Sequence, residues 1–144
     1  MHITSVQTSQ HSQDTTLIVW DLQEGEAVHT LQGHQRAVND VAFLPHKEQV
    51  VSASNDHTLK LWDIKTGECL HTFAGANRHQ EAILTVEVSP DGQRMFSGAK
   101  DFYIKVWDIP NRQFLHTLNQ HHLWINDIGL TKDNLYLFSA SEDK

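Results

Sequence analysis

The sequence predicts an all-β fold, a partial β-propeller made of four-stranded antiparallel blades, two of them complete and two incomplete. Three observations lead to this prediction. A set of tryptophan, histidine, serine and aspartate residues recurs along the whole chain, which is typical of repeat architectures. Short apolar and β-branched segments alternate with turn residues, as they do in propellers. No apolar period of 3.6 residues persists anywhere, so helices are not expected.

The repeat is anchored on three Trp-Asp pairs, which begin at Trp20, Trp62 and Trp107 and are therefore 42 and 45 residues apart. Other residues recur at fixed distances before the tryptophans: His34 and His79 at 28 residues, Ser52 and Ser97 at ten, and Asp14, Asp56 and Asp101 at six. A shift of 87 residues from the second repeat gives a fourth set at His121, Ser139 and Asp143. We expect blades at approximately residues 1–31, 32–73, 74–118 and 119–144.

Each repeat contains four short segments with the composition of strands. In the second repeat they are Val38–Phe43, Gln49–Ser54, Thr58–Ile64 and Glu68–Phe73. Residues that allow tight turns separate them, including Pro45 and Gly67. In the first repeat we expect the second strand around Val6–His11, which is poor in apolar residues.

Composition excludes several classes of function. The 144 residues are 39% hydrophobic, enough for one ordinary domain, and carry 11 basic and 18 acidic residues for a net charge of −7. Without clustered lysines and arginines, direct binding of nucleic acid is not expected. The chain has no apolar run that could span a bilayer and no signal-peptide core. The single cysteine, Cys69, allows no internal disulfide. We expect an intracellular protein, cytoplasmic or nuclear.

The Trp-Asp pairs, Gly33-His34 and the runs SASNDHTLKLWD and SGAKDFYIKVWD resemble the WD-repeat family over about residues 8 to 144. This resemblance implies a propeller that binds other proteins or peptides and is not an enzyme. The chain departs from the family pattern at three places. Arg78 and Gln120 precede His79 and His121 where the family usually has glycine, and Gln10 stands where serine is expected.

In that family a buried hydrogen-bond chain runs from tryptophan through serine and histidine to aspartate. The resemblance therefore implies structural tetrads, which we expect at His34, Ser52, Asp56 and Trp62, at His79, Ser97, Asp101 and Trp107, and, without its tryptophan, at His121, Ser139 and Asp143. The same histidine, serine and aspartate could instead form a hydrolase site. Because an enzyme needs one such site and a repeat fold needs one per blade, the recurrence favours the structural interpretation, and no catalytic residue is predicted.

Histidines also recur nine residues after each tryptophan, at His29, His71 and His116. Equivalent positions on neighbouring blades diverge radially and are poorly placed to share one ion. We therefore predict no metal site and no cofactor.

Candidate partner-binding residues lie in the loops before the first strand and between the second and third strands, which emerge on one face of a propeller, here called the upper face. We select Arg36, Asn55, Lys100, Phe102 and Trp124. Large aromatic side chains in such loops are typical binding anchors. Trp124 could equally pack inward as the first apolar residue of its strand, and Phe102 could also be a packing residue.

The stretch from His34 to Trp107 is also similar to two blades of the Polycomb propeller family of the embryonic ectoderm development subunit. The similarity is carried by SASNDHTLKLWDIKT, AGANRH and HQEAIL. It implies an alternative function, the reading of methylated lysine in a chromatin complex, with Trp124 as one wall of an aromatic cage.

A partial ring leaves blade faces without a neighbour, with Leu137 and Phe138 near one of them. Exposed apolar patches and unpaired strand edges favour association. We therefore expect further propeller blades, or self-association, to cover these faces.

Overall fold

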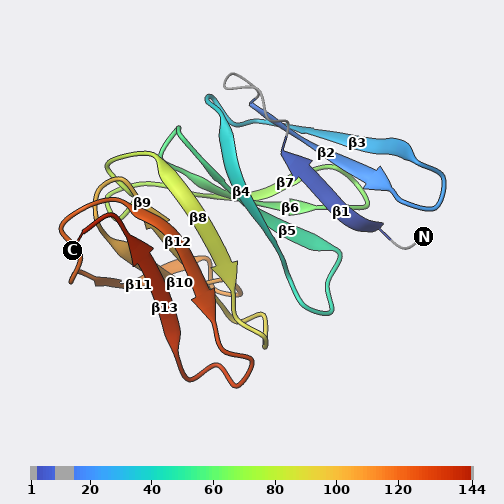
Figure 1. Cartoon of the computed structure of the whole chain (residues 1–144). Coiled ribbons are helices and arrows are strands. Elements are labelled where there is room, and N and C mark those ends of the chain that lie inside the picture. Colours follow the sequence, from blue (N-terminus) through green and yellow to red (C-terminus); the bar gives the residue numbers. More distant parts are fainter. Residues whose placement is uncertain (1–2, 9–14, 144) are drawn as a thin grey trace.

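The computed structural model describes residues 3–8 and 15–143, and within them the chain forms strands and no helix. The strands make four antiparallel sheets in chain order (Figure 1). The first sheet holds β1 (Ile3–Thr8), β2 (Thr16–Asp21) and β3 (Glu26–Gln32). The second holds β4 (Val38–Phe43), β5 (Gln49–Ser54), β6 (Leu59–Asp63) and β7 (Cys69–Phe73). The third holds β8 (Ile83–Val88), β9 (Arg94–Ala99), β10 (Ile104–Asp108) and β11 (Gln113–Leu118). The fourth holds β12 (Ile125–Leu130) and β13 (Leu137–Ser141). The predicted fold class, an all-β partial propeller, is confirmed.

The strands of the second sheet lie where the apolar segments predict them, with β6 and β7 shorter by one or two residues. The first sheet differs. Its β1 begins at Ile3, three residues before the expected Val6, and the residues after Thr8 up to 14 lie outside the described part of the chain. The expected end of this strand, up to His11, thus lies outside the described residues.

Turns between the third and fourth strands need a left-handed residue, and the chain supplies it in two ways. Gly67 has a φ of +75°, and its N–H donates to the carbonyl of Asp63 at 3.0 Å. In the third sheet Arg112, which follows Pro110 and Asn111, adopts a φ of +57° at the matching position. An arginine there costs more than glycine, so the flanking strands hold the turn in place.

The innermost strands β4, β8 and β12 lie side by side (Figure 1) and carry the hydrogen bonds that join successive sheets. Asp40 on β4 accepts the N–H of Val86 on β8 at 2.9 Å, and the Asn39 amide donates to the carbonyl of Ile83 at 2.7 Å. The pairing register of each inner strand shifts by one residue just before Asp40 or the residue that corresponds to it, Thr85 in β8 and Asp127 in β12. This irregularity lets the Asp40 side chain reach β8.

Apolar side chains fill the spaces between successive sheets. The largest cluster packs Ala53, Leu61 and Phe73 of the second sheet against Met95 and Trp107 of the third. A second cluster joins the first and second sheets around Leu17, Leu31 and Trp62, and a third joins β10 to β12 around Ile125. The second and third sheets thus bury both faces against their neighbours, and the first and fourth sheets each bury one, which is the packing of propeller blades.

Candidate functional site

The tetrad residues of the second and third sheets form continuous hydrogen-bond chains. In the second sheet the Trp62 Nε1–H donates to Ser52 Oγ at 2.8 Å, the serine lies 2.7 Å from His34 Nε2, and His34 Nδ1 lies 2.7 Å from Asp56 Oδ2. The third sheet repeats this chain, with distances of 3.0 Å from Trp107 to Ser97, 2.8 Å from Ser97 to His79 and 2.9 Å from His79 to Asp101.

The direction of the protons in these chains follows from their ends. An indole N–H can only donate, and an ionised carboxylate can only accept. A neutral imidazole between them therefore donates from Nδ1 to the aspartate and accepts the serine O–H at Nε2. Ser52 and Ser97 are fully buried, and a tryptophan N–H already occupies an acceptor site on each oxygen. Neither oxygen is open to a substrate, as a nucleophile would have to be.

The aspartates that end the two hydrogen-bond chains have a lower pKa than free aspartate. Burial alone would raise the pKa of Asp56, but hydrogen bonds from His34, Thr58 and the Gln35 N–H outweigh burial and hold that pKa well below its usual range. Asp101 has the same balance, in which the bonds from His79 and two backbone N–H groups lower its pKa against the effect of burial. These carboxylates are therefore charged, and they accept hydrogen bonds from donors within the fold.

The other two copies are more open or lie outside the described residues. His121 bonds to Ser139 at 2.7 Å and to Asp143 at 2.9 Å, with side chains of His121 and Asp143 that are 25% and 24% exposed. In the first repeat, Asp14 and Gln10 fall outside the described part of the chain. Among the described residues, Trp20 Nε1 has no hydrogen-bond acceptor.

Two candidate partner-binding residues, Lys100 and Trp124, come together on the upper face. Trp124 is 41% exposed, and Lys100 Nζ lies 4.1 Å from the centre of its ring. This places a cation on the electron-rich face of the indole. Phe102, two residues after Lys100 and two before β10 begins, is 38% exposed and has a φ of +73°.

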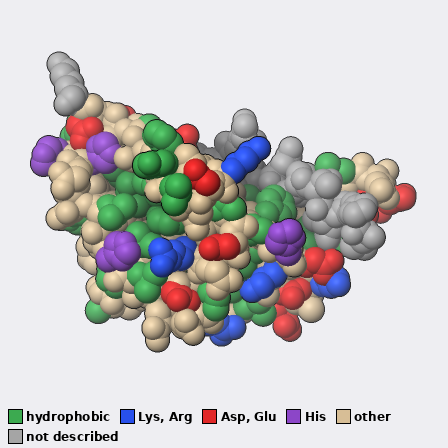
Figure 2. All heavy atoms as spheres, turned by 90° about the horizontal axis from the view of Figure 1, so that it is seen from below, with side chains coloured by type: hydrophobic (Ala, Val, Ile, Leu, Met, Phe, Trp, Pro, Cys, Tyr) green, Lys and Arg blue, Asp and Glu red, His purple; other side chains and the backbone are tan. Residues whose placement is uncertain are grey.

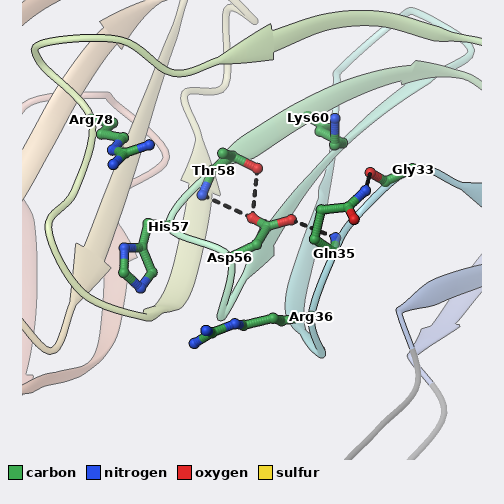
Figure 3. Close-up of a pocket in the computed structure, with 8 residues that line it drawn as sticks. All are labelled: Gly33, Gln35, Arg36, Asp56, His57, Thr58, Lys60 and Arg78. Carbon is green, nitrogen blue, oxygen red and sulfur yellow. Dashed lines mark hydrogen bonds between the residues drawn. The ribbon is translucent and has the colours of Figure 1, made fainter.

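The other two candidates belong to the second sheet. Asn55 is half-buried, and its side-chain oxygen accepts the Asn39 amide at 2.7 Å, so part of its polar surface is already paired. Arg36 is exposed and lines a groove of about 370 Å³ on the upper face (Figure 3). Of the five candidates, Lys100 and Trp124 are thus in contact, Arg36 lines a separate groove, and Asn55 does not line that groove.

The groove also contains three basic residues that the sequence-based selection missed: His57, Lys60 and Arg78. One of them carried a visible signal, since Arg78 stands where the WD pattern has glycine. Lys60 is part of a strand, and no pattern in the sequence shows that it reaches a loop groove. Among the described residues, no group of three or more histidines, cysteines or acidic residues could hold a metal ion.

Comparison with known families agrees with this geometry. The WD domain, G-beta repeat family matches residues 25–63, 67–108 and 112–144. The first two matched segments run from the outermost strand of one sheet to the Trp-bearing strand of the next, and the third covers β11, β12 and β13. The chain is a repeat protein built of propeller blades. It belongs to the WD-repeat family, whose members commonly serve as protein-interaction scaffolds and are usually not enzymes.

A search among curated protein sequences finds no match to this chain. The family match supports the WD repeat in general and no narrower group within it. Within residues 3–8 and 15–143, no helix is long and apolar enough to cross a membrane.

Proposed function

We propose that this chain is a non-catalytic interaction scaffold that binds a protein or peptide partner on its upper face. The observation that carries the proposal is the partial exposure of three large side chains in the loops before β10 and β12, Trp124, Phe102 and Leu123, at 41%, 38% and 42%. Large side chains that stay exposed in loops held by a rigid sheet are the usual anchors of protein interfaces. The blade limits at approximately 1–31, 32–73, 74–118 and 119–144 belong to the same proposal.

The Lys100 ammonium over the Trp124 ring supports a role as anchor. The contact holds the indole in one orientation on the surface without burying it. A side chain already ordered before binding loses less conformational entropy when a partner covers it.

Replacing Trp124 with alanine is expected to weaken binding of the partner by on the order of 2 kcal/mol, roughly 30-fold in Kd. Partners retained by the immobilised wild-type chain would be identified by mass spectrometry, and their affinities for both chains measured by calorimetry. Leu115→Ala is the matched control, because Leu115 is equally exposed, at 40%, but lies on the outermost strand β11. Equal affinities of the wild type and the Trp124 variant would contradict the proposal.

The reading of methylated lysine is the second candidate function. One specific observation favours it, the lysine ammonium that already lies on the Trp124 ring. A trimethylated ammonium would use the same ring face and would have to displace Lys100. A peptide with trimethyllysine should then bind more tightly than its unmodified form, and Lys100→Ala should increase this preference. Equal binding of both peptides would exclude this function.

The outer face of the last sheet extends the proposal to further blades or a second copy of the chain. Leu135, Tyr136 and Phe138 are 71%, 64% and 65% exposed on and beside β13. Figure 2 views the molecule from below. On this face, which holds the loops that follow β4, β8 and β12, hydrophobic side chains lie among charged ones. We expect light scattering at micromolar concentration to detect association of the chain, reduced in a Phe138→Ser variant. A monomer with a cooperative melt would contradict this expectation.

A further inference from the structure

The upper-face groove beside the second sheet gathers four basic side chains from separate parts of the chain. Arg36 comes from the loop between β3 and β4, His57 from the loop between β5 and β6, Lys60 from β6 and Arg78 from the loop between β7 and β8. Figure 3 shows them on different sides of the groove. Three further residues of its lining, Gly33, Gln35 and Thr58, carry no charge.

The one acidic residue in the lining, Asp56, forms no salt bridge with these groove residues in the described part of the chain. Asp56 accepts hydrogen bonds from His34 at 2.7 Å, from the Gln35 N–H at 2.9 Å and from the Thr58 hydroxyl at 2.6 Å, and its side chain is 8% exposed. In the part of the chain that the structure describes, Arg36, Lys60 and Arg78 form no salt bridge. The Lys60 ammonium donates to Thr72 Oγ1 at 2.8 Å and keeps donors to spare. A chain with a net charge of −7 thus exposes unpaired cations in one groove.

The repeat fold itself does not require most of these cations. The residues of the third repeat that correspond to Arg36 and His57 are Glu81 and Phe102, and that repeat forms the same tetrad and the same four strands. Arg78 of the third repeat corresponds to Gly33 of the second. A β-carbon on Gly33 would lie 3.2 Å from the Trp62 ring, so packing in the second repeat favours a glycine at this position and does not call for an arginine. Lys60 alone has a basic counterpart, Lys105. The charge is therefore a property of this groove and not of the blade.

We propose that this groove binds an acidic segment of a partner protein, with its carboxylates paired to Arg36 and Arg78. Arginine presents a planar fork that matches a carboxylate with two hydrogen bonds. The two arginines come from different loops, on different sides of the groove, and so can pair with separate carboxylates along an extended chain. This inference rests on the proposed function of the upper face, and it adds the chemistry of the partner.

The test uses a fluorescent octaglutamate peptide and the full chain, with octaglutamine as the uncharged probe. Wild type is expected to bind octaglutamate at least tenfold more tightly than octaglutamine, and the affinity should fall as salt is raised from 50 to 300 mM. The double variant Arg36→Glu/Arg78→Glu should lose at least tenfold in affinity. The milder pair Arg36→Gln/Arg78→Gln, which removes charge without repulsion, should lie between the two.

The matched control is Arg112→Glu/Lys132→Glu, which makes the same change in net charge at exposed residues outside the groove. It should keep near wild-type affinity, and the melting temperature of each variant shows whether its fold is intact. The inference is overturned if wild type does not bind octaglutamate, or if the control pair loses as much affinity as the groove pair. If Trp124→Ala abolishes capture of the partner while the groove pair does not change it, the proposed function stands and this inference fails.

Discussion

Replacement of His79 by alanine is expected to lower the free energy of unfolding by about 1–3 kcal/mol at neutral pH. His79 is fully buried, and its ring bonds to Ser97 at 2.8 Å and to Asp101 at 2.9 Å. Alanine leaves the Ser97 hydroxyl without its acceptor and removes one donor from the largely buried Asp101 carboxylate. A buried polar group that lacks a hydrogen-bond partner destabilises the fold, because no interaction replaces the water that it bound when unfolded. Urea unfolding followed by tryptophan fluorescence measures the change.

The cost of this substitution should depend on pH. The bonds from His79 help to hold the pKa of Asp101 below its usual value. A group whose pKa is lowered by folding adds stability above its ordinary pKa, about 4, and that stability is lost as the pH falls through the lowered value. In the variant the pKa of Asp101 rises, so this contribution shrinks. The difference between wild type and variant should therefore be full at pH 5–7 and narrow below about pH 4.

A matched control and an enzymatic readout separate a structural tetrad from a hydrolase site. His116→Ala removes an exposed histidine of β11 and should leave stability unchanged. A His79 variant that kept the wild-type unfolding curve, while losing a measurable esterase or peptidase activity, would show that the tetrad is catalytic instead.

The arrangement of strands could be predicted because the repeat fixes it. Ser52 and Lys60 are directly opposed in the β5–β6 register, and each repeat brings its serine, histidine and aspartate to the same places by the same spacing. Landmarks that recur in sequence must recur in space when each copy forms the same sheet. The hydrogen-bond chains of the second and third sheets join these recurring residues.

The upper face could be predicted only in part, because loop conformation decides which side chains meet there. His57 and Phe102 adopt φ values of +69° and +73°, and a bulky phenylalanine gives no sign of a left-handed backbone. The contact between Lys100 and Trp124 joins two loops of different sheets and depends on both conformations. The groove depends likewise on Lys60, a strand residue whose long side chain reaches the loops beside it.

A close contact between the third and fourth sheets was equally hidden in the sequence. Gly98 occupies the position that corresponds to Ala53 and Ala140 in the neighbouring repeats. A glycine there looks like a conservative exchange. The reason for it lies in the next sheet, where Ile125 packs directly over the backbone of β9.

Substitution of Gly98 by alanine is expected to lower the free energy of unfolding by about 1–3 kcal/mol through overpacking. A β-carbon at this position would lie 2.5 Å from Cγ2 of Ile125 and 2.9 Å from Cγ2 of Thr85, closer than van der Waals contact allows. Ile125 is fully buried and has no room to withdraw. The sign is informative, because an unstrained change from glycine to alanine usually stabilises a protein by about 0.4–1 kcal/mol.

Two further variants locate the effect at the contact between β9 and β12. Gly129→Ala is the control, since a β-carbon on Gly129 meets nothing within 4 Å, and this change should be neutral or slightly stabilising. Ile125→Ala removes the nearest clashing atom, so in that background the additional cost of Gly98→Ala should fall to less than half, with Thr85 and the retained β-carbon at position 125 responsible for the remainder. Equal costs of Gly98→Ala in both backgrounds would mean that the blades do not meet at this pair, and the packing between the third and fourth sheets would need another explanation.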